Sequence, residues 1–232
     1  MTRLLIQTQT VPVMVNLPGI IPMTPAQFSE FCLANRDLRI ERTASGEVVI
    51  MPPVFSDTGN RNLKIAQQLA NWADLDGTGE TFDSSTGFTL PNGAIRSPDA
   101  CWIKLESWNA LTEEQKASFA PICPDFVIEL RSASDTLSAL QDKMQEYLDN
   151  GTSLGWLSDA ARSWGGSAVL GVSPMSDCRG FPHERLHQEI DRQNRKIYIY
   201  RPDQEPEILD NPETVSGAPE LMGFVLKMSK IW

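Results

Sequence analysis

The sequence predicts a single α/β (α+β) domain with a mixed central sheet flanked by helices, and three observations support this fold class. Helical and strand-like patterns follow one another in the order helix, hairpin, helix, strands, helix, strands. Phe126–Leu130, in which four of the five residues are apolar, is a segment of the kind that is buried on both faces of a sheet. With 232 residues, of which 41% are hydrophobic, the chain can bury a substantial core.

The first third of the chain is expected to form a helix, a β-hairpin and a long second helix. Thr24-Pro25-Ala26-Gln27 is a helix start, because Thr caps the backbone, Pro suits the first position and Gln the third. Residues 38–42 and 47–51 are predicted as two strands joined by a turn. From about Asp57 to Leu75 apolar residues repeat at helical spacing, and the predicted inner face comprises Leu63, Ala66, Ala70 and Ala73, widened by Leu69 and Trp72.

Extended segments and one further strong helix are expected in the rest of the chain. Residues 80–83, 87–90 and 95–103 are predicted as strands, followed by a connection with a short helix at Thr112 to Ser118. Ser134-Asp135 is expected to cap an amphipathic helix whose inner face carries Leu137, Leu140, Met144 and either Tyr147 or Leu148. Later strands are predicted at residues 154–157, 196–201 and 224–228.

Composition restricts the cellular setting and the partners. No apolar segment approaches the length of a membrane span and the N-terminus lacks the pattern of a signal peptide, so we expect a soluble, cytoplasmic protein without a membrane partner. The net charge of −10 argues against broad nonspecific binding to nucleic acid, although a local basic groove stays possible. The four cysteines have no paired spacing, and His183 and His187 lack the other residues of a zinc-protease motif.

The chain is expected to contain an N-terminal extension, residues 1–22, and one domain, residues 23–232. Residues 158–189 interrupt this domain, because they show no sustained periodicity and contain Gly165-Gly166 as well as both histidines. We interpret them as an exposed insertion, since the entropy cost of closing a loop grows only slowly with its length. A function as a lid or a regulatory segment is the alternative.

Two acidic residues on predicted strands form the candidate site. Asp99 follows Pro98 at the start of an apolar strand, and Glu129 lies inside Phe126–Leu130, where its neighbours indicate burial. Burying an ionised carboxylate is costly unless a metal, a cation or several hydrogen bonds compensate it. If the two carboxylates converge, their oxygen atoms are suitable ligands for Mg²⁺ or Mn²⁺, with water in the remaining positions.

Two basic residues could complete this site. The alternation of a strand would put Arg131 on the same face as Glu129. Lys143 lies on the following predicted helix, from which its long side chain could reach the carboxylates. A metal-activated water would then hydrolyse a phosphodiester. The alternative that these residues leave open is a simple ion pair between Glu129 and Arg131 at a sheet edge.

A series of motifs carries a family resemblance that extends from about Met23 to Trp232. In chain order the motifs are Asp83–Phe88, Arg96–Ala100, Pro124–Ser132, Leu154–Leu157, Tyr198–Pro202, Asn211–Gly217, Gly223–Leu226 and Lys230–Trp232. The series resembles the Uma2 family, the restriction-endonuclease branch of the PD-(D/E)xK nuclease superfamily. This resemblance implies a restriction-endonuclease-like core, preceded here by the N-terminal helix and β-hairpin.

The resemblance also implies a role for each candidate residue. Asp99 matches the aspartate of the PD motif, and Glu129 matches the second acid. Arg131 occupies the position of the motif's lysine, whereas Lys143 matches a lysine relocated to the next helix. Because arginine does not readily lose its proton, we favour Lys143 as the functional cation, with Arg131 assisting. Glu41 matches an acidic position of the first hairpin and is either an additional metal ligand or orienting group, or a solvated charge.

These inferences together predict a Mg²⁺- or Mn²⁺-dependent DNA endonuclease. Asp99, Glu129, Lys143 and Arg131 are its predicted catalytic residues, and Asp99, Glu129 and Glu41 its predicted metal ligands. We expect a homodimer, because cleavage of both DNA strands favours two sites related by twofold symmetry. The alternative is a catalytically inactive module that keeps the nuclease fold and binds nucleic acid or protein. The acidic net charge and the arginine at the lysine position favour that alternative.

Overall fold

A six-stranded mixed sheet is the centre of the computed structural model, which describes residues 13–15, 23–132, 135–159 and 195–232. The strand order is β11-β10-β9-β8-β7-β4, and β8 and β9 run parallel while the other neighbours run antiparallel. The strands are β4 (Gly79–Asp83), β7 (Ala100–Lys104), β8 (Phe126–Leu130), β9 (Leu154–Asp159), β10 (Lys196–Tyr200) and β11 (Glu207–Asp210). The prediction of a mixed sheet is confirmed.

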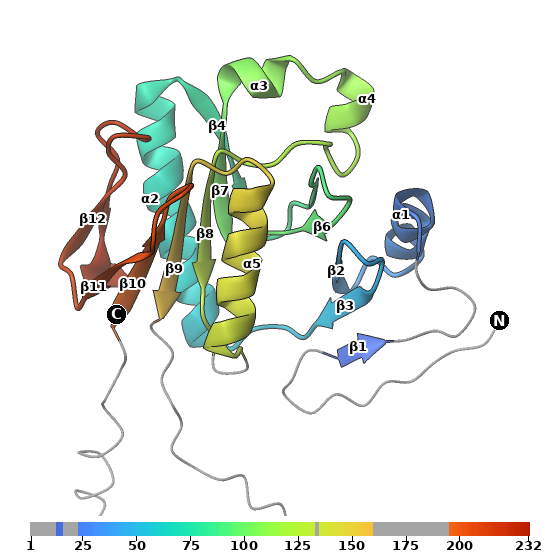
Figure 1. Cartoon of the computed structure of the whole chain (residues 1–232), viewed down its shortest axis with the longest axis horizontal. Helices are drawn as coiled ribbons and strands as arrows, with labels where there is room; N and C mark the ends of the chain where they lie inside the picture. The colour runs from blue at the N-terminus through green and yellow to red at the C-terminus, as the bar shows by residue number, and fades with distance from the viewer. Residues whose placement is uncertain (1–12, 16–22, 133–134, 160–194) are drawn as a thin grey trace, which may run out of the picture.

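Helices α2 (Ser56–Asp76) and α5 (Leu137–Asp149) pack on opposite faces of this sheet (Figure 1). Successive residues of β8 point to alternate faces, so Phe126 and Ile128 belong to the hydrophobic cluster of α2, whereas Val127 belongs to that of α5. β8 is therefore buried on both faces, as its predominantly apolar sequence predicts. The same alternation turns the side chain of Glu129, the fourth residue of β8, towards α5.

A second, smaller sheet has the strand order β1-β3-β2-β6-β5 and lies beside α1 (Figure 1). These elements are β1 (Val13–Val15), α1 (Pro25–Ala34), β2 (Arg39–Arg42), β3 (Val48–Met51), β5 (Phe88–Thr89) and β6 (Ile95–Arg96). The capping box predicted for α1 is present, because Thr24 and Gln27 each accept a hydrogen bond from the other's backbone N–H. The predicted hairpin is β2–β3. β1 pairs with β3, so part of the expected N-terminal extension belongs to this sheet.

Short elements complete the described chain. Two short helices, α3 (Leu105–Asn109) and α4 (Glu113–Lys116), lie between β7 and β8. Near the C-terminus a hairpin of β12 (Thr214–Ser216) and β13 (Val225–Lys227) is followed by the 3₁₀ helix η1 (Met228–Lys230), and it adds to the cluster of α2. Across the described ranges, no helix has both the length and the apolar character needed to cross a membrane.

Three predicted features of the elements are wrong in detail. The single strand expected at residues 95–103 is instead β6 and β7, which belong to different sheets, because Pro98 has no N–H for pairing. Leu63, placed on the inner face of α2, is 61% exposed, and the buried apolar residues are Ile65, Leu69 and Ala73. The N-cap of α5 is Thr136, whose hydroxyl accepts a hydrogen bond from the backbone N–H of Ala139.

The strand before the expected insertion is longer than predicted. Ser158 and Asp159 continue β9 and pair with Ile197 and Lys196 of β10. The first two residues assigned to the insertion therefore belong to the central sheet. The remainder of that segment, with both histidines, lies outside the described residues.

Candidate active site

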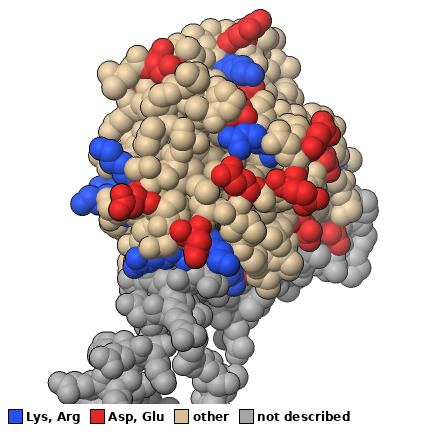
Figure 2. Space-filling view, turned by 60° about the vertical axis from the view of Figure 1, so that its left-hand side comes forward, with Lys and Arg blue, Asp and Glu red and all other residues tan. Residues whose placement is uncertain are grey.

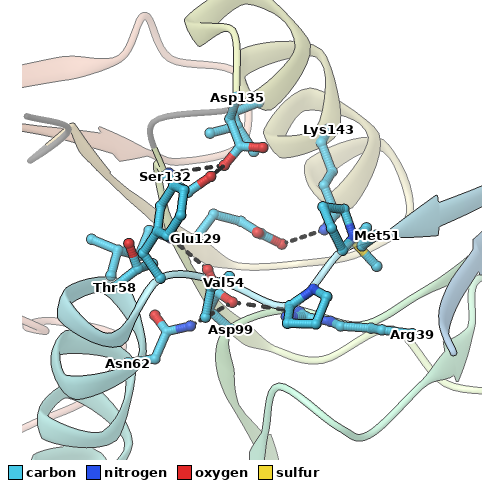
Figure 3. A pocket seen from close by; sticks show the side chains of 15 residues that line it. Arg39, Met51, Val54, Thr58, Asn62, Asp99, Glu129, Ser132, Asp135 and Lys143 are labelled. Atoms are coloured by element: carbon cyan, nitrogen blue, oxygen red, sulfur yellow. Dashed lines mark hydrogen bonds and ion pairs between the residues drawn. The ribbon is translucent and has the colours of Figure 1, made fainter. Parts of the chain in front are cut away.

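Asp99, Glu129 and Lys143 line one cavity of about 210 Å³ beside the central sheet (Figure 3). Asp99 immediately precedes β7, Glu129 is the fourth residue of β8, and Lys143 projects from α5. Met51, the last residue of β3, and residues 52–55, which connect β3 to α2, form another part of the lining. The structure thus brings together three of the predicted site residues from three separate segments.

The strand pairing is interrupted at Pro98, and this interruption allows the Asp99 carboxylate to point to β8. The register between β7 and β8 pairs Ala100 with Ile128, so an extended β7 would set Pro98 opposite Leu130. Instead, Asp99 Oδ2 accepts the backbone N–H of Leu130 at 2.9 Å. The carboxylate replaces a ladder acceptor and ties the segment of Asp99 to the strand of Glu129.

The other oxygen of Asp99 faces donors from two further elements (Figure 3). Asn62 Nδ2, on α2, donates to Asp99 Oδ1 at 3.0 Å. Arg39 Nη2, on β2, lies 3.5 Å from the same oxygen. Asp99 is only 9% exposed, and these donors compensate part of the cost of burying it.

Glu129 is buried and is contacted by two residues of α5. Lys143 Nζ lies 2.8 Å from Glu129 Oε1, and the Tyr147 hydroxyl donates to the same oxygen at 3.2 Å. Lys143 and Tyr147 are one helical turn apart and therefore face the same way. Burial raises the pKa of Glu129 to about 7; the charge of Lys143 opposes this rise, and the charges of Asp99 and Glu41 add to it.

Glu41, on β2, is also buried, but its partners are cationic and backbone groups. Its Oε1 accepts from Lys143 Nζ at 3.0 Å and from the backbone N–H of Ser97 at 2.9 Å. Its Oε2 lies 3.2 Å from Arg96 Nη1. Burial alone would raise the pKa of Glu41, but the charges of Lys143 and Arg96 outweigh this effect and lower it.

Charges of opposite sign therefore alternate from Glu146 through Arg96, Glu41 and Lys143 to Glu129. Arg96 Nε closes the outer end of this chain at 2.6 Å from Glu146 Oε2. Burial alone would lower the pKa of Lys143, but the two carboxylates beside it outweigh burial and raise the pKa. Lys143 consequently stays protonated and holds a fixed positive charge next to Glu129.

The donor atoms at the cavity agree with the predicted metal only in part. Asp99 and Glu129 line the cavity and offer the hard oxygen atoms that Mg²⁺ and Mn²⁺ prefer. Glu41 does not line it, and the described part of the chain contains no group of three or more His, Cys, Asp or Glu residues arranged to hold one metal ion. Two protein carboxylates nevertheless suit Mg²⁺, which usually keeps several water ligands.

Arg131 does not point to the carboxylates, contrary to the expectation from strand alternation. β8 ends at Leu130, and Arg131 Nη1 lies 2.9 Å from Asp159 Oδ1 at the end of β9. Its Nε donates to the backbone carbonyl of Asp135. Arg131 thus compensates the buried charge of Asp159 and is absent from the cavity lining, so the structure puts Lys143 alone of these two cations at Glu129.

Sequence reasoning missed Asn62, Arg39 and Arg96 and assigned Tyr147 only to the core. Arg96 is part of the Arg96–Ala100 motif, which was a usable signal. Asn62 is one of several polar residues of α2, and its sequence context does not set it apart.

One face of the molecule carries charges of both signs, and the rim of the cavity is partly apolar. On the face shown in Figure 2, Lys and Arg side chains are interspersed with Asp and Glu side chains. At the cavity itself, Val54 and Phe55 are 43% and 62% exposed, so apolar side chains form part of its rim.

Comparisons with known proteins agree with this fold. The model of the Uma2 family, described as "Putative restriction endonuclease", matches residues 25–229. A crystal structure from Anabaena variabilis, described as a putative nuclease belonging to DUF820, is similar with a TM-score of 0.60 and 16% identity, and the match covers 90% of this chain and 97% of that one. At this identity the likeness concerns the fold alone, and it confirms the expected fold class. No curated protein matches the chain. Family and fold together support a nuclease, and the chain belongs to the Uma2 family.

Proposed function

We propose that this protein is a metal-dependent endonuclease that hydrolyses DNA phosphodiester bonds at the cavity of Asp99, Glu129 and Lys143. The observation that supports this most directly is the convergence of two buried carboxylates and one ammonium group on a single cavity. A fold that needed only stability would not require these charges, because well-packed apolar residues are often as stabilising as a buried ion pair.

Asp99 and Glu129 would hold the metal ion, Mg²⁺ or Mn²⁺. When bound, the ion would supply Lewis acidity, which activates a water and neutralises charge on the phosphate. The backbone N–H of Leu130 holds Asp99 in place, and the Tyr147 hydroxyl holds Glu129. Both carboxylates are thus oriented before any ligand arrives, which reduces the reorganisation needed during the reaction.

Lys143 acts in this proposal as a fixed positive charge. It keeps its proton between Glu41 and Glu129, so it serves to stabilise negative charge that develops on the phosphate. A homodimer would supply a second such site for the opposite DNA strand. Sedimentation of the purified chain measures this association.

Nicking of supercoiled plasmid tests the proposed activity. We expect cleavage with Mg²⁺ or Mn²⁺, none with a chelator, and a loss of about 100-fold or more in Asp99→Asn and in Glu129→Gln. Asp142→Asn, at an exposed position of α5, is the matched control and should cleave like the wild type. Cleavage that persists undiminished in both site variants would contradict the proposal.

A second candidate function is a catalytically inactive module that binds nucleic acid or protein. The favouring observations are the net charge of −10 and the pairing of Lys143 with both Glu41 and Glu129. Calorimetry with Mn²⁺ separates the two candidates, because the endonuclease must take up the ion and the inactive module need not.

A further inference from the structure

Asn62 and Arg39 both line the cavity with a buried polar atom that has no hydrogen-bond partner within the described residues, and of the two only Asn62 leaves an acceptor unpaired. Its Nδ2 donates to Asp99 Oδ1 at 3.0 Å, and its side chain lines the cavity beside Asp99 (Figure 3). Its Oδ1 atom is buried and has no hydrogen-bond partner within the described residues. A buried acceptor without a partner lowers the stability of the fold. Because this acceptor lies at a cavity lined by two buried acidic residues, we infer that its oxygen has a role in binding.

The position of this amide fits a metal ligand. Rotating it by half a turn exchanges nitrogen and oxygen, which are nearly equal in size, and places Oδ1 where Nδ2 now lies, 3.0 Å from Asp99 Oδ1. Two neighbouring ligands of an octahedral Mg²⁺, with bonds of about 2.1 Å, are about 3 Å apart. With a cation between them, Asn62 Oδ1 and Asp99 Oδ1 could both be ligands at this distance. Without a cation the two oxygens would repel one another, and the amide would instead turn its N–H group to the carboxylate.

We propose that Asn62 Oδ1 is the third protein ligand of the metal site, together with Asp99 and Glu129. This inference rests on the proposed function, because it assumes that the two carboxylates hold a divalent cation. An amide oxygen adds a hard donor without adding a third negative charge to the cavity. Arg39, the other neighbour of Asp99 Oδ1, cannot take this role, since a guanidinium group has no acceptor.

The test is a calorimetric titration of the full chain with Mn²⁺ in the absence of DNA. Three variants are compared with the wild type: Asn62→Ala, Asn62→Asp and Asp99→Asn. Asn71→Ala, at an exposed asparagine on the same helix, is the matched control. Thermal unfolding without metal checks that each variant is folded, and Asn62→Asp keeps the shape of the side chain if Asn62→Ala does not fold.

We expect Asn62→Ala to bind Mn²⁺ about 10-fold or more weakly than the wild type, and Asn71→Ala to bind it normally. Asn62→Asp loses the N–H donor but keeps an oxygen, so a ligand role predicts wild-type or tighter binding. Equal weakening in Asn62→Ala and Asn62→Asp would overturn the inference, because Asn62 would then only orient Asp99.

The experiment also separates this inference from the proposed function. If Mn²⁺ binding is lost in Asp99→Asn but unchanged in Asn62→Ala, the role of Asn62 is overturned and the endonuclease proposal stays in place. No uptake by the wild-type chain overturns both.

Discussion

The ammonium group of Lys143 lies 2.8 Å from Glu129 Oε1, although the two residues belong to different elements. Arg131, only two positions after Glu129 in the chain, turns to Asp159 instead. The cation nearest in sequence is thus not the cation nearest in space. This arrangement makes Lys143 and Arg131 separable by experiment.

Replacing Lys143 by alanine should impair cleavage without impairing metal binding. The variant removes a positive charge that would stabilise the phosphate, and we expect nicking to fall by about 100-fold. Its Mn²⁺ affinity should stay equal or increase, since a competing cation has left Glu129. Lys104→Ala, at an exposed lysine, is the control. Wild-type nicking by Lys143→Ala would remove Lys143 from the mechanism.

Replacing Arg131 by alanine should affect stability and leave the cavity intact. Asp159 is buried and would lose its cationic partner, which we expect to lower the free energy of unfolding by about 2 kcal/mol. Urea unfolding measures this loss, and Arg36→Ala, at an exposed arginine, should show none. A folded Arg131→Ala protein that no longer binds Mn²⁺ would show that Arg131 belongs to the site after all.

Glu41→Gln should distinguish a positioning role from a ligand role. Because Glu41 contacts Lys143 and Arg96 outside the cavity lining, we expect nicking to fall by about 10-fold while Mn²⁺ affinity changes little. Glu47→Gln, on the same hairpin, is the control. A loss of Mn²⁺ affinity comparable to that of Asp99→Asn would instead identify Glu41 as a ligand.

The pKa of Glu129 predicts how stability depends on pH without divalent ions. This pKa is about 7 in the folded protein against an ordinary 4.5, so the stabilising contribution is complete below pH 4.5 and is lost as the pH rises through about 7. Between pH 5 and pH 8 we expect the wild type to lose about 2.5 kcal/mol more than Glu129→Gln. Parallel urea-unfolding profiles for the two proteins would contradict this shift.

Several elements and the two acids could be predicted from the sequence because their signals are local. The capping box of α1, the apolar segment of β8 and the periodicity of α5 each depend on residues within one element. The Asp99 and Glu129 positions emerged for a related reason, since an acid at the start of an apolar strand or within one is conspicuous in the sequence itself.

Only the tertiary structure decided which groups meet these acids. Extending the β7–β8 register would set Pro98 opposite Leu130, and this directs Asp99 to the Leu130 N–H. Because β8 ends at Leu130, the side chain of Arg131 turns to Asp159 of β9. The packing of α5 on the sheet brings Lys143 to Glu129. These contacts join residues from separate elements, so they depend on strand register and helix packing. The sequence by itself determined where buried charge occurs in this protein, and the three-dimensional packing determined how that charge is compensated.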